Sequence, residues 1–422
     1  MSLALEIEQQ YQNERFQKMV NWFVFFMVFP CINILDNSIT FYFFLYFVIQ
    51  LGIYWRNNFF LKGTFFALIG VFVLAAVFAP YSEMTRYRGF THTFQLTIQY
   101  IYWALTSCFF IIYKNNINWK ELSKWVFYGL IFFTIGFYFV DLSFSFGVGT
   151  FGTKASRNAF VFNMLCSVPL AFTYIKYRFG MKWVPYFLFG FIVILMFTNG
   201  RSGGIIILVE TLIISAILYP RWLKALKILI LPLFVLFFVM QTDTVQRAML
   251  RVGVALESVN PRLAGMFLGE GAEGNLKTDK SWLERKLQVE KGFEIIHDHP
   301  LLGVGPGNYS SYDARLSNFI SYERLNSATR DYYNTRSAHN SYIMMMGEFG
   351  LLGIGIFVFL QLVGLTNLFF RIFKGQINET HLPLVSLLGL SMHFYAIVAI
   401  TGSITWFTLG AALAVSTFAL RK

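Results

Sequence analysis

The sequence predicts an all-α integral membrane protein with about twelve transmembrane helices and one large, partly helical insert before the tenth. The first observation is composition, because 56% of the 422 residues are hydrophobic, 19% are aromatic and only 13% are charged. So apolar a chain would expose too much hydrophobic surface as a soluble protein. The second is a series of apolar segments of roughly the 20 residues that cross a bilayer as a helix. The third is one long polar stretch that interrupts this series.

The twelve apolar segments define three regions of the chain. They lie at about residues 19–35, 39–54, 64–80, 94–113, 124–141, 158–175, 183–198, 202–219, 224–241, 351–370, 382–400 and 402–420. We therefore expect an N-terminal membrane domain of nine spans at 1–241, an insert at 242–338 and a C-terminal membrane domain of three spans at 339–422.

The distribution of basic residues predicts the orientation, because lysine and arginine gather on the cytoplasmic side of membrane proteins. With both termini in the cytoplasm, the termini and the cytoplasmic connections hold 17 of the 34 basic residues, and the short connections on the other side hold five. The insert holds 12 basic and 12 acidic residues, but a loop this long crosses regardless of its charge. The insert is therefore predicted to be extracytoplasmic. The net charge of +12 reflects this topology, and we expect no nucleic-acid partner.

The second half of the insert has recognisable local structure. Apolar residues at helical spacing predict an amphipathic helix over residues 282–296, which Asp298 to Pro300 end. The sequence GVGPGN at 303–308 follows. It lacks the preceding strand, the following helix and the lysine of a nucleotide-binding loop, so we expect a turn.

Metal and cofactor chemistry is not indicated by the sequence. Cys31, Cys108 and Cys166 lie in apolar segments and predict neither a disulfide framework nor a cysteine metal site. The run His297-Asp298-His299 offers two histidines, but the sequence places no further ligand beside them. The insert also has no Asp-x-Asp, the usual aid for a cation that bridges a sugar diphosphate. We expect no metal and no cofactor.

Basic residues on the extracytoplasmic side are the first candidates for a binding site. Arg201 lies between two apolar segments with almost no loop, where a charge is costly unless it is paired or functional. A guanidinium group is planar and suits phosphate oxygens. The alternative is a structural ion pair with Glu210 in the following segment. Other basic residues in the short connections on this side are Arg86, Arg88, Lys154 and Arg157.

His339 is the candidate general base, because it lies where the insert returns to the membrane and an unperturbed histidine has a pKa of about 6.5. Ser337 is expected to cap the next helix, which would place His339 in the first turn on the face of Tyr342 and Met346. Glu348 lies about half a turn away on that helix and is not expected to orient the imidazole. The alternative is a histidine that only caps or packs.

Three motifs together resemble one family, the O-antigen ligase and polymerase superfamily of bacterial envelope glycosyltransferases. They are NGRSGG around Arg201, Arg285 followed by HDHPLLGVGPGNY at 297–309, and His339-Asn340 followed after nine residues by Gly350-Leu-Leu-Gly353. Their order and spacing agree over residues 190–370. Val289 stands where an aromatic residue is usual, which affects local packing of the insert helix more than the chemistry.

The resemblance implies an enzyme of the bacterial inner membrane with a periplasmic active site. Its donor would be a glycan linked to polyprenyl diphosphate, and its acceptor would be a sugar hydroxyl of lipid A-core, both held in or at membrane lipid. His339, Arg201 and Arg285 would be catalytic. Arg86, Arg88, Arg157, Arg336 and Asn340 would bind substrate. The resemblance favours a ligase over a polymerase that joins lipid-linked repeat units. A flippase of lipid-linked sugars is a third interpretation, but the sequence shows no evident paired halves of the kind that transporters have.

Overall fold

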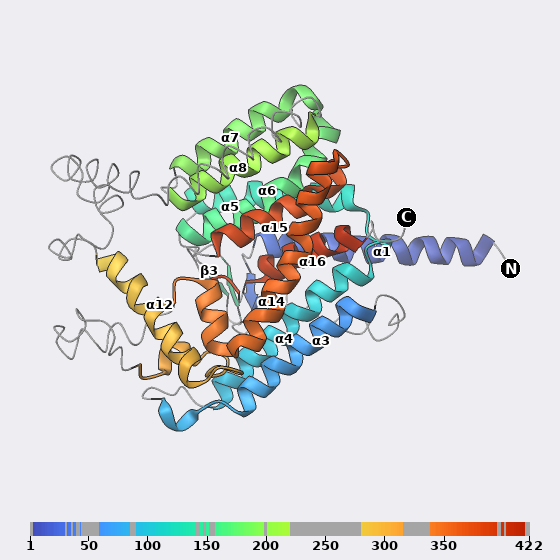
Figure 1. Ribbon diagram of the computed structural model, residues 1–422. Helices are drawn as coiled ribbons and strands as arrows, with labels where there is room; N and C mark the ends of the chain where they lie inside the picture. Colours follow the sequence, from blue (N-terminus) through green and yellow to red (C-terminus); the bar gives the residue numbers. More distant parts are fainter. Residues whose placement is uncertain are drawn as a thin grey trace, which may run out of the picture.

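The computed structural model describes residues 3–29, 32–34, 37–38, 43, 59–84, 90–139, 144–146, 149–151, 157–197, 201–219, 280–314, 338–394, 398–400 and 402–417. Helices dominate these residues, as the composition predicts (Figure 1). The labels below are those of Figure 1.

The elements follow one another along the chain as helices with a few short strands. The α-helices are α1 (Leu3–Val28), α3 (Phe59–Val77), α4 (Phe90–Ile112), α5 (Trp119–Phe139), α6 (Arg157–Phe179), α7 (Val184–Phe197), α8 (Arg201–Leu218), α12 (Lys280–Asp298), α14 (Ser341–Lys374), α15 (Leu382–His393) and α16 (Ser403–Thr417). Single turns of 3-10 helix are η1 (Tyr81–Glu83), η2 (Met181–Trp183), η4 (Tyr309–Ser311) and η5 (Glu379–His381). The strands are β1 (Ile32–Ile34), β2 (Asn37–Ser38), β3 (Phe144–Phe146) and β4 (Gly149–Phe151).

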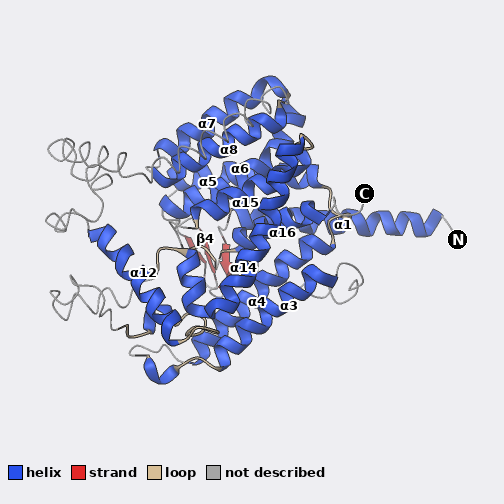
Figure 2. Cartoon of the chain, in the orientation of Figure 1, coloured by secondary structure: helices blue, strands red, loops and turns tan. Residues whose placement is uncertain are grey.

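The four strands form a small antiparallel sheet that the sequence analysis did not anticipate (Figure 2). Its order is β2-β1-β4-β3, and β1 pairs with β4 in the register Asn33 to Thr150. The sheet joins the segment after α1 to the segment between α5 and α6. Its strands are two or three residues long, too short to show an alternating pattern in sequence.

Three helices within the described residues are long and apolar enough to cross a membrane, at Phe90–Ile112, Phe160–Phe179 and Ser341–Lys374. Shorter apolar helices lie at Gly63–Val77, Met181–Ile194, Val209–Leu218 and Ser403–Ser416. The expected spans at 39–54 and 224–241 fall almost entirely outside the described residues. The other ten each overlap a helix, although the expected span at 19–35 ends in strand β1 and is helical only to Val28. The count of twelve spans stays a prediction.

Aromatic side chains hold the bundle together. Phe133 and Phe137 of α5 stack on Phe160 of α6, with ring centroids 5.2 and 4.2 Å apart. Phe110 of α4 meets Phe407 of α16 edge-on at 4.9 Å. Helix α14 contacts α3, α15 and α16 in this bundle and also contacts α12. In Figure 1 its first turns lie beside the end of α12, so α14 connects the insert to the bundle.

Candidate active site

The insert helix α12 runs from Lys280 to Asp298, which confirms the helix expected at 282–296. The glycine-rich turn after it is also confirmed. Gly303, Gly305 and Gly307 have φ values of 64°, 86° and 75°, a left-handed region that glycine enters without steric cost. Any other residue at these three positions would strain the backbone of the turn.

This turn docks into a break in α14. Gly350 interrupts the helix with φ 65° and ψ −167°. The backbone of residues 300–305 bonds to both sides of the break. Val304 N donates to Gly347 O at 2.9 Å, Gly305 N to Glu348 O at 2.9 Å, and Leu351 N to Pro300 O at 2.8 Å. The turn thus takes over hydrogen bonds that an unbroken helix would make with itself. We call this contact between 300–309 and 347–352 the glycine joint.

Glycines make the joint possible because the two backbones touch. A Cβ added at Gly350 would overlap the backbone of Leu301, and one at Gly303 would overlap the backbone of Gly347. A Cβ at Gly347 would meet the ring of Tyr309 at 2.6 Å. The motifs HDHPLLGVGPGNY and Gly350-Leu-Leu-Gly353, identified separately in the sequence, are therefore two faces of one contact.

Buried polar groups surround the joint. Glu348 is fully buried, and its Oε2 accepts a hydrogen bond from Tyr100 of α4 at 3.0 Å. Backbone groups of Gly307 and Tyr309 also interact with this carboxyl group. Glu348 thus joins α14 to α4 and the turn, in agreement with the expectation that it does not orient His339.

Tyr309 and Lys291 extend the joint to α12. The Tyr309 hydroxyl donates to the backbone oxygen of Gln288, and Lys291 Nζ lies 5.6 Å from the centre of the Tyr309 ring. Lys291 has no exposed surface. Burial lowers its pKa to about 7, although the negative charges of Asp313 and Glu294 act in the opposite direction. The sequence alone does not reveal this lysine, because its burial depends on the turn that packs against it.

His339 lies at the start of α14 but not within it, which corrects one expectation. The helix begins at Ser341 and its N-cap is Asn340, so Ser337 does not cap it. Asn340 Oδ1 accepts from Tyr342 N at 2.9 Å and from Ile343 N at 3.1 Å. The face shared with Tyr342 and Met346, inferred from a histidine in the first turn, is wrong for the same reason. His339 instead precedes the cap with φ 49° and is exposed.

The arginines are placed through their backbones only. Arg157 and Arg201 are the first residues of α6 and α8, and Arg285 lies in the second turn of α12. The side chains of these three arginines lie outside the described part of the chain, as do Arg86, Arg88 and Arg336 entirely. The grouping of arginines around His339 therefore stays a prediction.

Glu210 packs against the neighbouring helices. It is fully buried, and a Cβ on Gly389 of α15 would overlap its Oε1. The alternative ion pair between Glu210 and Arg201 stays a prediction, because the Arg201 side chain lies outside the described residues. His393 of α15 is also buried, and its ring stacks on that of Phe162 with centroids 5.9 Å apart.

The His297-Asp298-His299 run divides among different partners. His299 Nε2 lies 2.9 Å from Glu83 Oε2, and Asp298 Oδ2 accepts from the Tyr312 hydroxyl at 2.8 Å. His297 Nδ1 lies 3.0 Å from Asp298 Oδ1. Within the described ranges no group of three potential ligands could hold a metal ion. These side chains tie the end of α12 to η1, directly before the segment that carries Arg86 and Arg88.

Comparison with known families now adds an independent observation. Residues 185–358 match the model of the family described as O-antigen ligase. Over this region the chain is similar to the O-antigen ligase family. The matched region begins before Arg201, contains α12 and the whole glycine joint, and ends within α14. A search of curated proteins gives no match.

The similarity to the O-antigen ligase family and the apolar helices together indicate a bacterial membrane protein. Family members are membrane glycosyltransferase-like enzymes that act on lipid-linked glycans. The residues that the sequence analysis selected as catalytic, Arg201, Arg285 and His339, all lie inside the matched region.

Proposed function

We propose that the protein is an O-antigen ligase that transfers a glycan from a polyprenyl-diphosphate donor to a sugar hydroxyl of lipid A-core. One observation carries the proposal. The glycine joint fastens the helix of Arg285 to the helix that follows His339, and both belong to the region that matches the O-antigen ligase family. A cation for the leaving diphosphate and a base for the attacking hydroxyl then come from two elements in fixed contact.

The proposed reaction is a direct displacement with inversion. The acceptor oxygen bonds to the anomeric carbon of the donor sugar while the bond from that carbon to the diphosphate oxygen breaks. The electron pair leaves with the lipid diphosphate, whose charge Arg201 and Arg285 stabilise, and the hydroxyl proton passes to His339. The donor bond is already activated, so the step needs no nucleotide. Arginines occupy the role of a metal, and transfer should therefore persist in excess EDTA.

Topology follows from the charge distribution. Both termini are cytoplasmic, and the insert at 242–338 lies in the periplasm between membrane domains at 1–241 and 339–422. Reporter fusions at Lys120 and Lys280 should give opposite signals, and equal signals would contradict this arrangement. In this topology Arg86, Arg88, Arg157 and Arg336 lie on the periplasmic side, where we propose that they hold the diphosphate or the sugars.

The arginines can be tested individually. Removing one preorganised cation that stabilises developing charge should slow transfer by about 10²–10³-fold, so Arg201→Ala and Arg285→Ala should each nearly abolish it. Lysine should restore only part of the rate, because it keeps the charge and loses the planar fork. Full activity of Arg201→Ala would remove that residue from the site.

A deletion strain separates the ligase from its nearest alternative, a polymerase of the same family. Loss of a ligase should leave lipid A-core without O-antigen while lipid-linked polymer accumulates. Loss of a polymerase should leave core that carries a single repeat unit. A lipopolysaccharide gel of the strain distinguishes the two, and the single-unit pattern would overturn the ligase assignment.

A further inference from the structure

The segment before α14 exposes one side chain between two buried ones. The exposed fraction is 1% for Ala338 and 7% for Asn340, whereas His339 between them is exposed. His339 also has φ 49°, the one positive value at a residue other than glycine among the described residues. Of these three residues, only His339 presents its side chain at the surface.

The cap on α14 accounts for this turn. Asn340 adopts an extended conformation, with φ −149° and ψ 119°, and its Oδ1 accepts hydrogen bonds from the second and third residues of the helix. Such a cap holds its residue outside the helix while the next residue begins it. The direction in which the chain enters the helix is thereby fixed, and His339 is the residue immediately before this entry.

The first residues of α14 are also anchored to the rest of the bundle. Ser341 N donates to Phe394 O at 2.8 Å, and Ser341 Oγ accepts from Ala399 N at 2.9 Å. Tyr342 donates through its hydroxyl to Ser391 O at 2.9 Å. The first turn of α14 is therefore fixed against α15 and the segment after it, and the Asn340 cap connects this fixed turn to His339.

We propose that Asn340 is a positioning residue, which acts by aiming the imidazole of His339 and not by contacting sugar. The inference rests on the proposed function, in which His339 accepts the proton of the acceptor hydroxyl. It differs from the sequence-based expectation that Asn340 binds substrate, because the side-chain oxygen is already used by two backbone N–H groups. A cap made by serine would perform the same task, whereas a sugar contact made by the amide group would not survive that change.

Two substitutions separate these roles. Asn340→Ala removes the cap, and because a misplacement of about 1 Å can cost roughly 10²-fold in rate, we expect kcat to fall by that order with KM for donor and acceptor little changed. Asn340→Ser restores a cap of similar strength and should recover most of kcat. Recovery of kcat by serine cannot be explained by a sugar contact through the amide. A raised KM in both variants, without recovery by serine, would overturn the proposal.

A double-mutant cycle completes the test, with single-turnover transfer and thermal melting measured on the purified, full-length variants. In a His339→Gln background the change Asn340→Ala should add almost no further loss, because the residue acts only through His339. If the rate losses of the two single variants multiplied in the double variant, the proposal would be contradicted. Wild-type activity of Asn340→Ala, beside a wild-type enzyme that transfers and a His339→Gln variant that does not, would refute the positioning role alone. Absence of transfer by the wild-type protein would refute the proposed function, and the role of Asn340 with it.

Discussion

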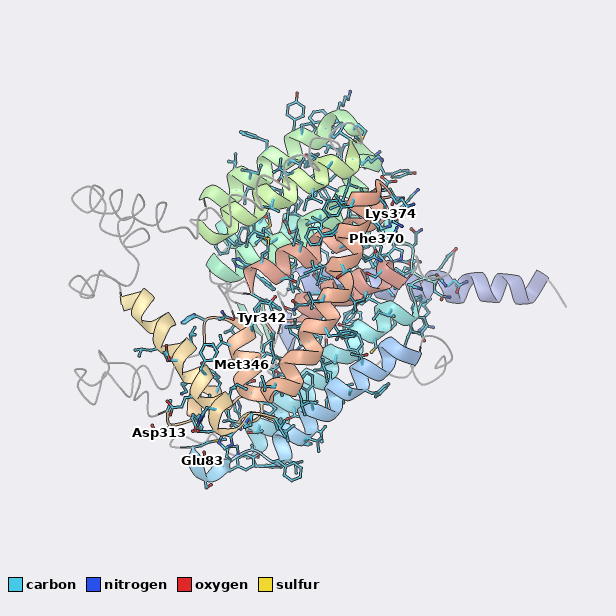
Figure 3. All side chains as sticks on the ribbon, in the orientation of Figure 1. Glu83, Asp313, Tyr342, Met346, Phe370 and Lys374 are labelled. Carbon is cyan, nitrogen blue, oxygen red and sulfur yellow. The ribbon has the colours of Figure 1, made fainter. Side chains whose placement is uncertain are left out.

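The two halves of α14 on either side of Gly350 are built in different ways. The half at 341–349 is surrounded by protein, carries buried Ser341 and Glu348, and meets the turn after α12 backbone to backbone. The half at 351–374 is an apolar helix with exposed Leu351 and Phe370 along its length. Figure 3 shows the labelled Tyr342 and Met346 on the first half and Phe370 and Lys374 at the far end of the second.

The difference shows where this protein tolerates change. The exposed side chains of the second half, such as Leu351 and Phe370, can adjust their rotamers or face lipid, so their replacement by other apolar residues costs little. The first half has less freedom where it meets the turn, because backbone atoms held by hydrogen bonds lie against it there. Position and geometry are most fixed where the turn after α12 meets the first half of α14.

The largest effect is expected for Gly350→Ala. The backbone values at Gly350 belong to a region occupied almost only by glycine, and a Cβ would overlap Leu301. We expect the free energy of unfolding to fall by about 3 kcal/mol or more, because the backbone strain and the steric overlap both destabilise the folded state. Gly355→Ala is the matched control on the second half, because nothing lies within 4 Å of its Cβ position. Thermal melts of the two purified variants should differ widely, and equal melting temperatures would contradict the contrast between the halves.

A smaller effect is expected at the contact between α12 and the first half. A Cβ on Gly292 would overlap the Cγ2 methyl group of Ile343, a side-chain atom and not backbone, so Gly292→Ala should lower the free energy of unfolding by about 1–3 kcal/mol. In an Ile343→Ala background the same change should cost almost nothing, because the overlapping atoms are gone. Melting temperatures of the wild type, the two single variants and the double variant give the coupling between Gly292 and Ile343. A Gly292→Ala loss that is unchanged by Ile343→Ala would mean that the two helices do not touch there.

The smallest effect is a pH-dependent gain from Lys291→Met. Burial sets the folded pKa of Lys291 near 7, below the ordinary 10.5, so the unfolded chain binds more protons between these values. Folding stability of the wild-type protein should therefore rise with pH in that window through this group. Attraction to Asp313 and Glu294 offsets part of the cost, and we expect methionine to stabilise by about 1 kcal/mol at pH 6, or roughly 2–4 °C, and by less at pH 9. A gain that grows with pH would contradict the burial of the charged lysine.

Local patterns predicted the separate pieces of this region but not their contact. The apolar spacing of residues 282–296 and the glycines of 303–308 specify a helix and a turn through short-range preferences alone. The break at Gly350 depends on hydrogen bonds from a turn about fifty residues earlier, which no local pattern contains. The choice of Asn340 over Ser337 as the cap is similar, because Ser341 is anchored by Phe394 and Ala399 and this fixes where the helix can start.

Single-turnover transfer by His339→Gln tests the central claim most directly, with donor binding and thermal melting of the same purified protein as controls. Glutamine keeps hydrogen bonding and approximate size but cannot accept a proton near neutral pH. The account predicts a rate lower by about 10²–10⁴-fold, with donor affinity and melting temperature close to wild type. A rate near wild type would show that His339 is not the base and would leave catalysis to the arginines.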